Sequence, residues 1–423
     1  MRRLILELAQ KFRPVMVRLL PIEFLRAVKR RMIRQSAQEA AHYQLKPLAP
    51  DTGENGINLV GYIQGEIGLG QSCRLVAGAL EASGLPYTIY NYQQVSAIRS
   101  SDHTWDWKIS DQTPYNINLF HINPYEIPLA FATLTSKLWD GRYNIAFWLW
   151  ELEEFPKEWT FAINCFHEIW TPSEFASDSI RRVTDKPVHT MPYYLEAPTD
   201  RSIRRGRFGL PEDVFLFLAM YDCNSTMERK NPMGAVRAFK EAFTPQEKGV
   251  GLVVKVNNPA EKDLRILREE LADYQNIWLL PEIYTKTETN SLISLVDTVV
   301  SLHRAEGFGL VPAEAMLLGT PVIATNWSAT TEFMDADSAC LVDYRLVPIE
   351  KDIGPYKKGQ RWADPDIHQA AAYMRRLYEE PDYCRRLAEN GKHRVETILG
   401  REQAAEKIRT RIQEIYTEAL GNG

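Results

Sequence analysis

Cysteine is scarce in this chain of 423 residues and follows no recognisable binding pattern. The five cysteines are odd in number, lie far apart and form no CxxC pair. This arrangement argues against a disulfide framework or a zinc site and favours a reducing compartment. The N-terminal sequence MRRLILELAQKF also lacks the apolar core and cleavage site of a secretory signal. We therefore expect a cytoplasmic protein.

Long apolar runs and low-complexity tracts are absent as well. The densest apolar stretches, NIAFWLW (144–150) and VFLFLAMY (214–221), have the length of strands. A membrane-spanning helix would need about 18 consecutive apolar residues. The chain has 45% hydrophobic and 25% charged residues, which is typical of a globular enzyme, and its length predicts roughly two or three domains.

The net charge of −5 is distributed unevenly. Residues 1–34 contain ten Lys and Arg against two Glu, which gives +8 locally and leaves −13 on the rest of the chain. Apolar residues recur among these charges at nearly helical spacing, and such a segment can bind an anionic bilayer surface. The alternative is a solvated helical arm packed on the body. We expect peripheral contact with the inner face of a membrane, and no nucleic-acid binding because the body is acidic.

From about residue 56 onward, strand-like apolar stretches alternate with helical patterns. Prolines, glycines and charges interrupt the alternation at 195–213, after which it restarts. Each alternating set predicts a parallel sheet covered by helices. We expect an α/β protein with two Rossmann-like, doubly wound domains facing each other across a cleft. The expected parts are a basic N-terminal extension (1–50), a first domain (51–197), a second domain (198–398) and a C-terminal helix (399–423).

The segment RAEGFGLVPAE (304–314) combines acids, glycines and a proline directly after a predicted strand at 298–303. Glu306 follows the carboxyl end of that strand, where open α/β sheets bind ligands. Gly307 and Gly309 let the backbone approach a ligand, and the next helix offers its N-terminal amides to an anion. Carboxylates beside an anion site would repel the ligand unless they accept hydrogen bonds from its hydroxyl groups. The combination therefore suggests a nucleotide-sugar, which carries both phosphates and hydroxyls.

EGFGLVPAE, followed by AMLLGTPVIAT and by Glu332, resembles the EX7E signature of the retaining group 1 glycosyltransferases, which have the GT-B fold. The resemblance is dense at 297–333 and coarse over 57–420. It implies that Glu306 contacts the donor hexose and Glu314 the ribose. It also implies that main-chain amides near the loop meet the pyrophosphate; this donor-binding segment comprises Gly307, Phe308, Gly309, Leu310 and Val311.

STMERKNP (225–232) supplies two cations just after the first strand of the second domain, where they could clamp a diphosphate leaving group. In the family an Arg usually precedes a Lys by five residues. Lys230 matches that Lys, but Ser225 occupies the Arg position, and Arg229 is the expected substitute. Lys255 on the next strand is a further candidate for donor binding. A solvated Arg-Lys pair is the alternative interpretation.

Three further features remain candidates. His121, at the end of a first-domain strand, resembles a histidine that lines the cleft in the family; a buried structural histidine is the alternative. GEIGLGQS (65–72) resembles the first glycine-rich loop of the fold, and Gly68 and Gly70 are expected near donor or acceptor, unless the loop is a plain tight turn. Asp335-Ala-Asp337 is expected to be a solvated turn. We expect no cofactor and no catalytic metal.

The resemblance implies a retaining hexosyltransferase without a covalent protein nucleophile. Its expected substrates are a nucleotide-sugar donor and a saccharide or lipid-linked acceptor, in the synthesis of cell-surface polysaccharide or glycan. It also implies a C-terminal helix that packs back on the first domain. The alternatives are a non-catalytic nucleotide-sugar-binding subunit, a phosphorylase and a nucleotide-sugar epimerase.

Overall fold

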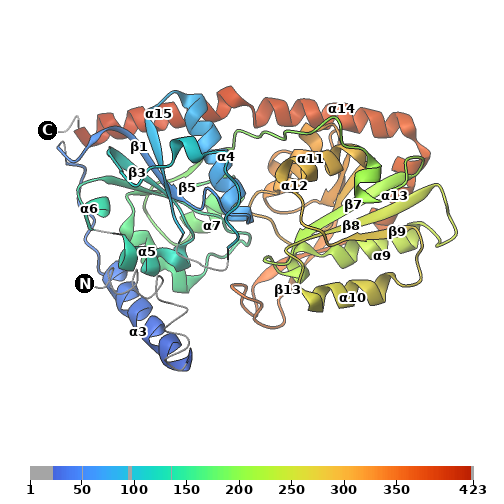
Figure 1. The fold of residues 1–423 in the computed structure, drawn as a ribbon, viewed down its shortest axis with the longest axis horizontal. Helices are drawn as coiled ribbons and strands as arrows, with labels where there is room; N and C mark the ends of the chain where they lie inside the picture. Colours follow the sequence, from blue (N-terminus) through green and yellow to red (C-terminus); the bar gives the residue numbers. More distant parts are fainter. Residues whose placement is uncertain (1–21, 50, 94–97, 135, 421–423) are drawn as a thin grey trace.

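The computed structural model describes residues 22–49, 51–93, 98–134 and 136–420. The first domain is built on a six-stranded parallel sheet with strand order β2-β1-β3-β4-β5-β6 (Figure 1). The strands are β1 (Glu54–Gly61), β2 (Tyr87–Asn91), β3 (Tyr115–His121), β4 (Tyr143–Phe147), β5 (Glu168–Thr171) and β6 (Val188–Thr190). Helices α4 (Gly68–Ser83), α5 (Ile127–Thr133), α6 (Ser136–Trp139) and α7 (Glu174–Arg181) connect them, and α3 (Ile22–Ala41) precedes them.

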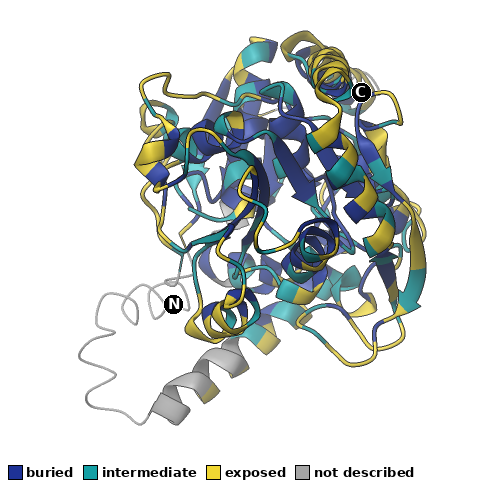
Figure 2. Cartoon of the chain, turned by 90° about the vertical axis from the view of Figure 1, so that its right-hand side faces the viewer, coloured by how far each residue is buried: buried dark blue, intermediate teal, exposed yellow. Residues whose placement is uncertain are grey.

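The second domain repeats this plan with the order β12-β11-β10-β7-β8-β9. Its strands are β7 (Phe215–Asp222), β8 (Val250–Asn257), β9 (Ile277–Leu280), β10 (Thr298–Ser301), β11 (Val322–Thr325) and β12 (Cys340–Val342). The helices between them are α8 (Met227–Lys230), α9 (Pro232–Ala242), α10 (Glu261–Leu271), α11 (Lys286–Leu295) and α12 (Leu310–Leu317). The central strands are buried and the outward helix faces exposed (Figure 2), as continuous Val, Ile and Leu runs require, whereas the edge strands β6 and β9 are partly exposed.

Three C-terminal helices follow: α13 (Ile367–Glu379), α14 (Pro381–Ile398) and α15 (Arg401–Leu420). In Figure 1 α14 and α15 run along one side of both domains. α14 packs on α12, and α15 packs on α4 of the first domain. The buried Arg411 guanidinium fixes α15 there through an ion pair with Glu168 on β5, at 2.7 Å. The chain passes from one domain to the other twice, near Leu195 and again near Leu399, between α14 and α15. There the Leu195 N–H donates to the Leu399 carbonyl at 3.1 Å.

The prediction of two doubly wound domains is confirmed. The apolar stretch at 144–150, which has the length of a strand, is strand only in its first part: β4 ends at Phe147, and residues 148–156 form an irregular segment at the cleft. Sequence analysis also missed the antiparallel hairpin of β13 (Tyr344–Pro348) and β14 (Arg361–Pro365), which is inserted between β12 and α13.

Candidate active site

A cavity of about 1030 Å³ lies between the carboxyl ends of the two sheets. In the first sheet the strand order reverses between β1 and β3, and in the second between β7 and β10. Loops that leave such switch points diverge and open a crevice, which is where α/β sheets bind ligands. The cavity is lined by the loops after β1, β7 and β10, so it lies at both switch points.

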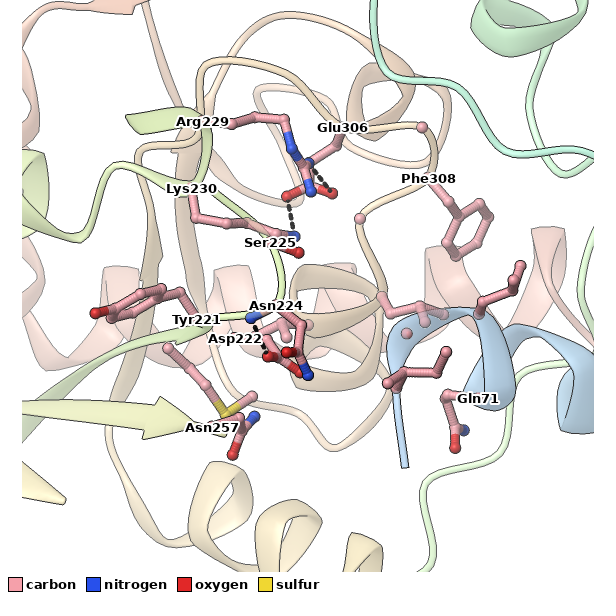
Figure 3. Close-up of a pocket in the computed structure, with 18 of the residues that line it drawn as sticks. Gln71, Tyr221, Asp222, Asn224, Ser225, Arg229, Lys230, Asn257, Glu306 and Phe308 are labelled. Carbon is pink, nitrogen blue, oxygen red and sulfur yellow. Dashed lines mark hydrogen bonds and ion pairs between the residues drawn. The ribbon is translucent and has the colours of Figure 1, made fainter. Parts of the chain in front are cut away.

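Glu306 lies beside Arg229 and Lys230 in this cavity, as Figure 3 shows. Lys230 Nζ donates to its Oε1 at 2.5 Å, and Arg229 Nη1 lies 3.4 Å from its Oε2. Burial alone would raise the pKa of Glu306, but the two cations lower it to about 2. The carboxylate therefore stays ionised at any physiological pH and can accept hydrogen bonds from a ligand.

Glu314, eight positions further on, forms a second pair with a lysine. Its side chain is 1% exposed, and its Oε1 accepts from Lys286 Nζ at 2.6 Å. Lys286 is the first residue of α11, whose start is fixed by a capping box in which Thr285 and Glu288 exchange hydrogen bonds. Sequence analysis missed Lys286, because Thr285 and Glu288 predict a helix start but do not predict what the first residue faces.

The loop between these acids ends in the N-terminus of α12. Gly309 is the N-cap residue at φ +96°, Pro312 lies in the first turn, and Gly319 follows the helix at φ +77°. First-turn amides have no partner within their own helix, so those of Leu310 and Val311, which line the cavity, are available to an anion.

The two glycines of the loop are required by packing as well as by ligand approach. A Cβ on Gly307 would lie 2.7 Å from the Trp150 carbonyl oxygen of the first domain, and one on Gly309 would overlap the Thr330 side chain. Phe308 between them lines the cavity and meets Tyr193 of the first domain edge-on, with ring centroids 4.7 Å apart. The loop is therefore held against both domains.

The loop after β7 brings Ser225, Thr226, Arg229 and Lys230 to the cavity. The Thr226 hydroxyl is buried and has no hydrogen-bond partner within the described residues. Arg229 is also buried, and its Nη1 donates to the Ala305 carbonyl at 2.8 Å. Its Nε has no partner among the described residues. Ser225 thus lies on the cavity wall, while the guanidinium comes from Arg229, four residues later.

The structure does not bring Lys255 to the cavity. Its Nζ donates to Asn257 Oδ1 at 2.7 Å and to the Glu282 carbonyl at 2.8 Å. Burial lowers the pKa of this lysine to about 8. Its position near the end of β8 predicted donor contact, but oxygens of its own domain occupy the ammonium group, and its neighbour Asn257 lines the cavity instead.

His121 also lies outside the cavity lining. It is fully buried, and its Nε2 lies 2.7 Å from the Ser72 hydroxyl, which in turn hydrogen-bonds Tyr193. Burial lowers the pKa of His121 to about 3, so the imidazole is neutral. Ser72 and Tyr193 line the cavity, so His121 lies one hydrogen bond behind the cavity wall.

Gly68 and Gly70 have different surroundings. Gly68 is exposed on the cavity wall, and a Cβ there would meet nothing. A Cβ on Gly70 would overlap the Gly65 carbonyl oxygen, and Gly70 does not line the cavity. Gly70 therefore closes the turn before α4, whereas Gly68 leaves room at the cleft.

Within the described part of the chain, no group of three or more His, Cys, Asp or Glu side chains is arranged to hold a metal ion. Asp335 and Asp337 lie in a turn in which the Asp335 carboxylate pairs with Arg394 at 2.7 Å and accepts from Ser338. Among the described helices, none combines the length and hydropathy needed to cross a bilayer.

Residues 214–349 match the family described as Glycosyl transferases group 1, which places the match on the charged loops of the second domain. Two curated proteins align with part of the chain. MMP alpha-(1->4)-mannosyltransferase of Mycolicibacterium hassiacum is 32% identical over 104 residues, 24% of this chain and 21% of that protein. Alpha-1,3/1,6-mannosyltransferase ALG2 of Candida albicans is 28% identical over 134 residues, which are 31% of this chain and 27% of that protein. The matches thus span about a quarter of these relatives.

Solved structures share the fold over most of the chain. HepE of Anabaena, in complex with UDP and glucose, superposes with a TM-score of 0.59 at 13% identity, covering 85% of this chain and all of that one. Sucrose-phosphate synthase of Thermosynechococcus elongatus superposes with a TM-score of 0.62 at 14% identity, covering 86% of this chain and all of that one. These likenesses show that the two facing domains form the GT-B fold.

Proposed function

We propose that the protein is a glycosyltransferase that moves a hexose from a nucleotide-sugar to a saccharide or lipid-linked saccharide. The observation that carries this proposal is the pair of buried carboxylates, Glu306 and Glu314, each joined to a lysine beside the N-terminus of α12. Carboxylates that accept from hydroxyls and cations that face phosphates suit the two ends of a nucleotide-sugar.

Donor binding would add hydroxyl partners to these pairs. Hydroxyls of the hexose and ribose would donate to Glu306, at the Oε2 atom that Lys230 leaves open, and to Glu314, beside Lys286. The two ammonium groups and the α12 amides would then meet diphosphate oxygens. Positive groups that face the departing diphosphate stabilise charge that develops in the transition state, so they raise kcat.

The reaction that we propose retains the anomeric configuration. The acceptor oxygen bonds to the anomeric carbon as the bond from that carbon to the diphosphate oxygen breaks, and the acceptor proton passes to the departing diphosphate. No covalent bond to the protein is needed, and the contribution of the chain is positioning and electrostatics. The products are the extended saccharide and a free nucleoside diphosphate.

The group 1 match and the mannosyltransferase relatives support hexosyl transfer, and the bound UDP and glucose of the Anabaena structure support a nucleotide-sugar donor. We propose a role in the synthesis of cell-surface polysaccharide or glycan at the cytoplasmic side of a membrane. Residues 1–21 lie outside the described residues, and α3 packs through Ser36 and Ala40 near its C-terminal end.

The membrane contact is tested by deleting residues 1–34. Sedimentation with liposomes containing anionic phosphatidylglycerol should fall strongly on deletion, and liposomes of neutral phosphatidylcholine serve as the control. Equal sedimentation of the full-length and shortened proteins would refute the contact.

The activity is tested by a thermal-shift screen across nucleotide-sugars, followed by mass spectrometry of products formed on candidate saccharides. Acceptor-dependent release of nucleoside diphosphate identifies a transferase. Binding without turnover would instead identify a nucleotide-sugar-binding subunit, sugar release by inorganic phosphate a phosphorylase, and interconversion of the donor an epimerase.

A further inference from the structure

The hairpin of β13 and β14 extends from the second domain to residues 150–158 of the first, which include the end of the irregular segment and the start of a short helix at Lys157–Cys165. It is rooted next to the charged loop, because Asp364 pairs with Arg304 at 2.9 Å and the Ala363 N–H donates to the Arg304 carbonyl. From its tip and C-terminal strand it contacts the first domain: Lys357 lies 3.6 Å from Glu158 and Arg361 lies 3.4 Å from Glu153. These outer pairs are solvent-exposed, so each contributes little to stability.

The tip also makes a buried contact with the same segment. Tyr356 is 5% exposed and stacks on Trp150, with ring centroids 5.5 Å apart. Its hydroxyl donates to Glu151 Oε2 at 3.2 Å. Tyr356, Trp150 and Glu151 all line the cavity, so the hairpin and the first domain together form one wall of the site.

This wall meets the charged centre of the site at Arg229. Glu151 Oε1 lies 3.7 Å from Arg229 Nη2, and the guanidinium carbon lies 5.9 Å from the Tyr356 ring centroid. On its other side, Arg229 Nη1 lies 3.4 Å from Glu306. One buried guanidinium is thus shared between a carboxylate of each domain, and a buried charge needs such partners.

The sharing affects which oxygen of Glu306 a ligand can use. Lys230 occupies Oε1 through a direct hydrogen bond, whereas Arg229 stays 3.4 Å from Oε2 and gives its Nη1 hydrogen bond to the Ala305 carbonyl. Without the charge of Glu151, Glu306 would be the remaining anion in contact with Arg229. The guanidinium would then move onto Oε2 and compete with a sugar hydroxyl.

We infer that Glu151 and Tyr356 are positioning residues that hold Arg229 away from Glu306 Oε2, so that the hexose end of the site is complete only when the hairpin bridges the two domains. This inference rests on the proposed function, since it deepens the role of the same site. It assigns to the inserted hairpin a contribution to sugar transfer that is separate from nucleotide binding, because Glu314 and Lys286 pair with each other on α12 and α11.

The test compares Glu151→Gln with Glu153→Gln, a matched change in the same segment that breaks an exposed hairpin pair. Glu151→Gln should lower kcat/KM for sugar transfer roughly 30-fold, because the displaced guanidinium would compete with the sugar hydroxyl for Glu306 Oε2 in the transition state. It should leave the calorimetric Kd for the nucleoside diphosphate within about twofold. Glu153→Gln should change neither. Equal activity of Glu151→Gln and wild type, or an equal loss in Glu153→Gln, would overturn the inference.

Tyr356→Phe keeps the stacking on Trp150 and removes the hydroxyl. It should lower kcat/KM by a smaller factor with unchanged KM for the donor, and this variant decides the question if Glu151→Gln does not fold. If the wild type transfers no sugar, the proposed function fails by itself. The inference is then decided by urea unfolding of both single variants and the double variant, where additive midpoint changes would overturn it and a smaller combined change would support it.

Discussion

The two glycine-rich loops of the cleft have the same local plan and different chemistry. Residues 65–72 in the first domain and 306–314 in the second each connect a parallel strand to the N-terminus of a cavity-lining helix. In the first loop, Glu66 pairs with Arg99 at 3.7 Å, and both side chains are partly exposed. In the second, both acids are buried and hydrogen-bonded to lysines.

The comparison shows that a strand–turn–helix unit provides a place for a ligand, while buried ionisable side chains determine what is bound there. A half-exposed ion pair is screened by water and contributes little. A buried pair keeps its full charge in a low dielectric, so replacing one partner with a ligand group has a large energetic effect. The variants below are chosen to test this difference between the loops.

The largest effect is expected for Glu306→Gln, with Glu66→Gln as the matched change in the first loop. Losing the Glu306 carboxylate removes the proposed contact to the hexose, leaves Lys230 without its anion and leaves Arg229 with Glu151 alone. We expect kcat/KM for sugar transfer to fall at least about 100-fold, or about 3 kcal/mol, against less than about threefold for Glu66→Gln. Similar losses in both variants would show that the loops do not differ in this way.

A smaller effect is expected for Lys286→Met compared with Arg99→Met. Under the proposed function Lys286 meets the nucleotide end of the donor, so its loss should weaken binding of the free nucleoside diphosphate roughly 10-fold, about 1.4 kcal/mol. Arg99 pairs with Glu66 in the first loop, and its loss should leave this Kd unchanged. Calorimetry on both variants measures the difference, and equal affinities in wild type and Lys286→Met would remove Lys286 from the site.

The two glycines of the first loop serve different purposes: Gly70 is required by close packing, whereas Gly68 leaves space at the cavity wall. Gly70→Ala should destabilise the protein by about 2 kcal/mol, since the new Cβ overlaps a backbone oxygen and forces a shift. Gly68→Ala should leave the unfolding free energy within about 0.5 kcal/mol of wild type. Urea denaturation measures both, and a tolerant Gly70 would contradict the close turn before α4.

The smallest effect concerns pH. The folded pKa of Glu306 lies near 2, below its ordinary value of 4.5, so the stability that its ionised form contributes is present above about pH 4.5. It is lost as pH falls toward 2, because the unfolded chain then binds the proton more readily. The stability difference between wild type and Glu306→Gln should therefore shrink between pH 5 and 3. A constant difference would show that the carboxylate is not held ionised by its neighbours.

The fold could be predicted from the sequence because strand and helix periodicities alternate so regularly on either side of residues 195–213. The charged loop could be located because Glu306 and Glu314 flank a glycine turn after a strand. The hairpin at 344–365 could not, since it is a short antiparallel pair within an alternating region, and its contact with Trp150 is a long-range one.

The contacts that individual side chains make were harder to predict than the positions of the loops. His121 lies at the end of a strand and Lys255 within one, as expected, yet both are buried against groups of their own domain. Local sequence gives the position of a residue along a strand, but it does not show which neighbouring oxygen or hydroxyl will occupy its polar atoms. Lys286 was missed for the converse reason, because its partner lies 28 residues away.

The adjacent crossings at Leu195 and Leu399 have a mechanical consequence. The polypeptide passes between the domains at both places, and a main-chain hydrogen bond joins these two segments. The two domains are therefore expected to rotate relative to each other about a single hinge at these segments, with α14 moving with the second domain and α15 with the first. A bulky group attached between α14 and α15 would obstruct this rotation without touching any ligand.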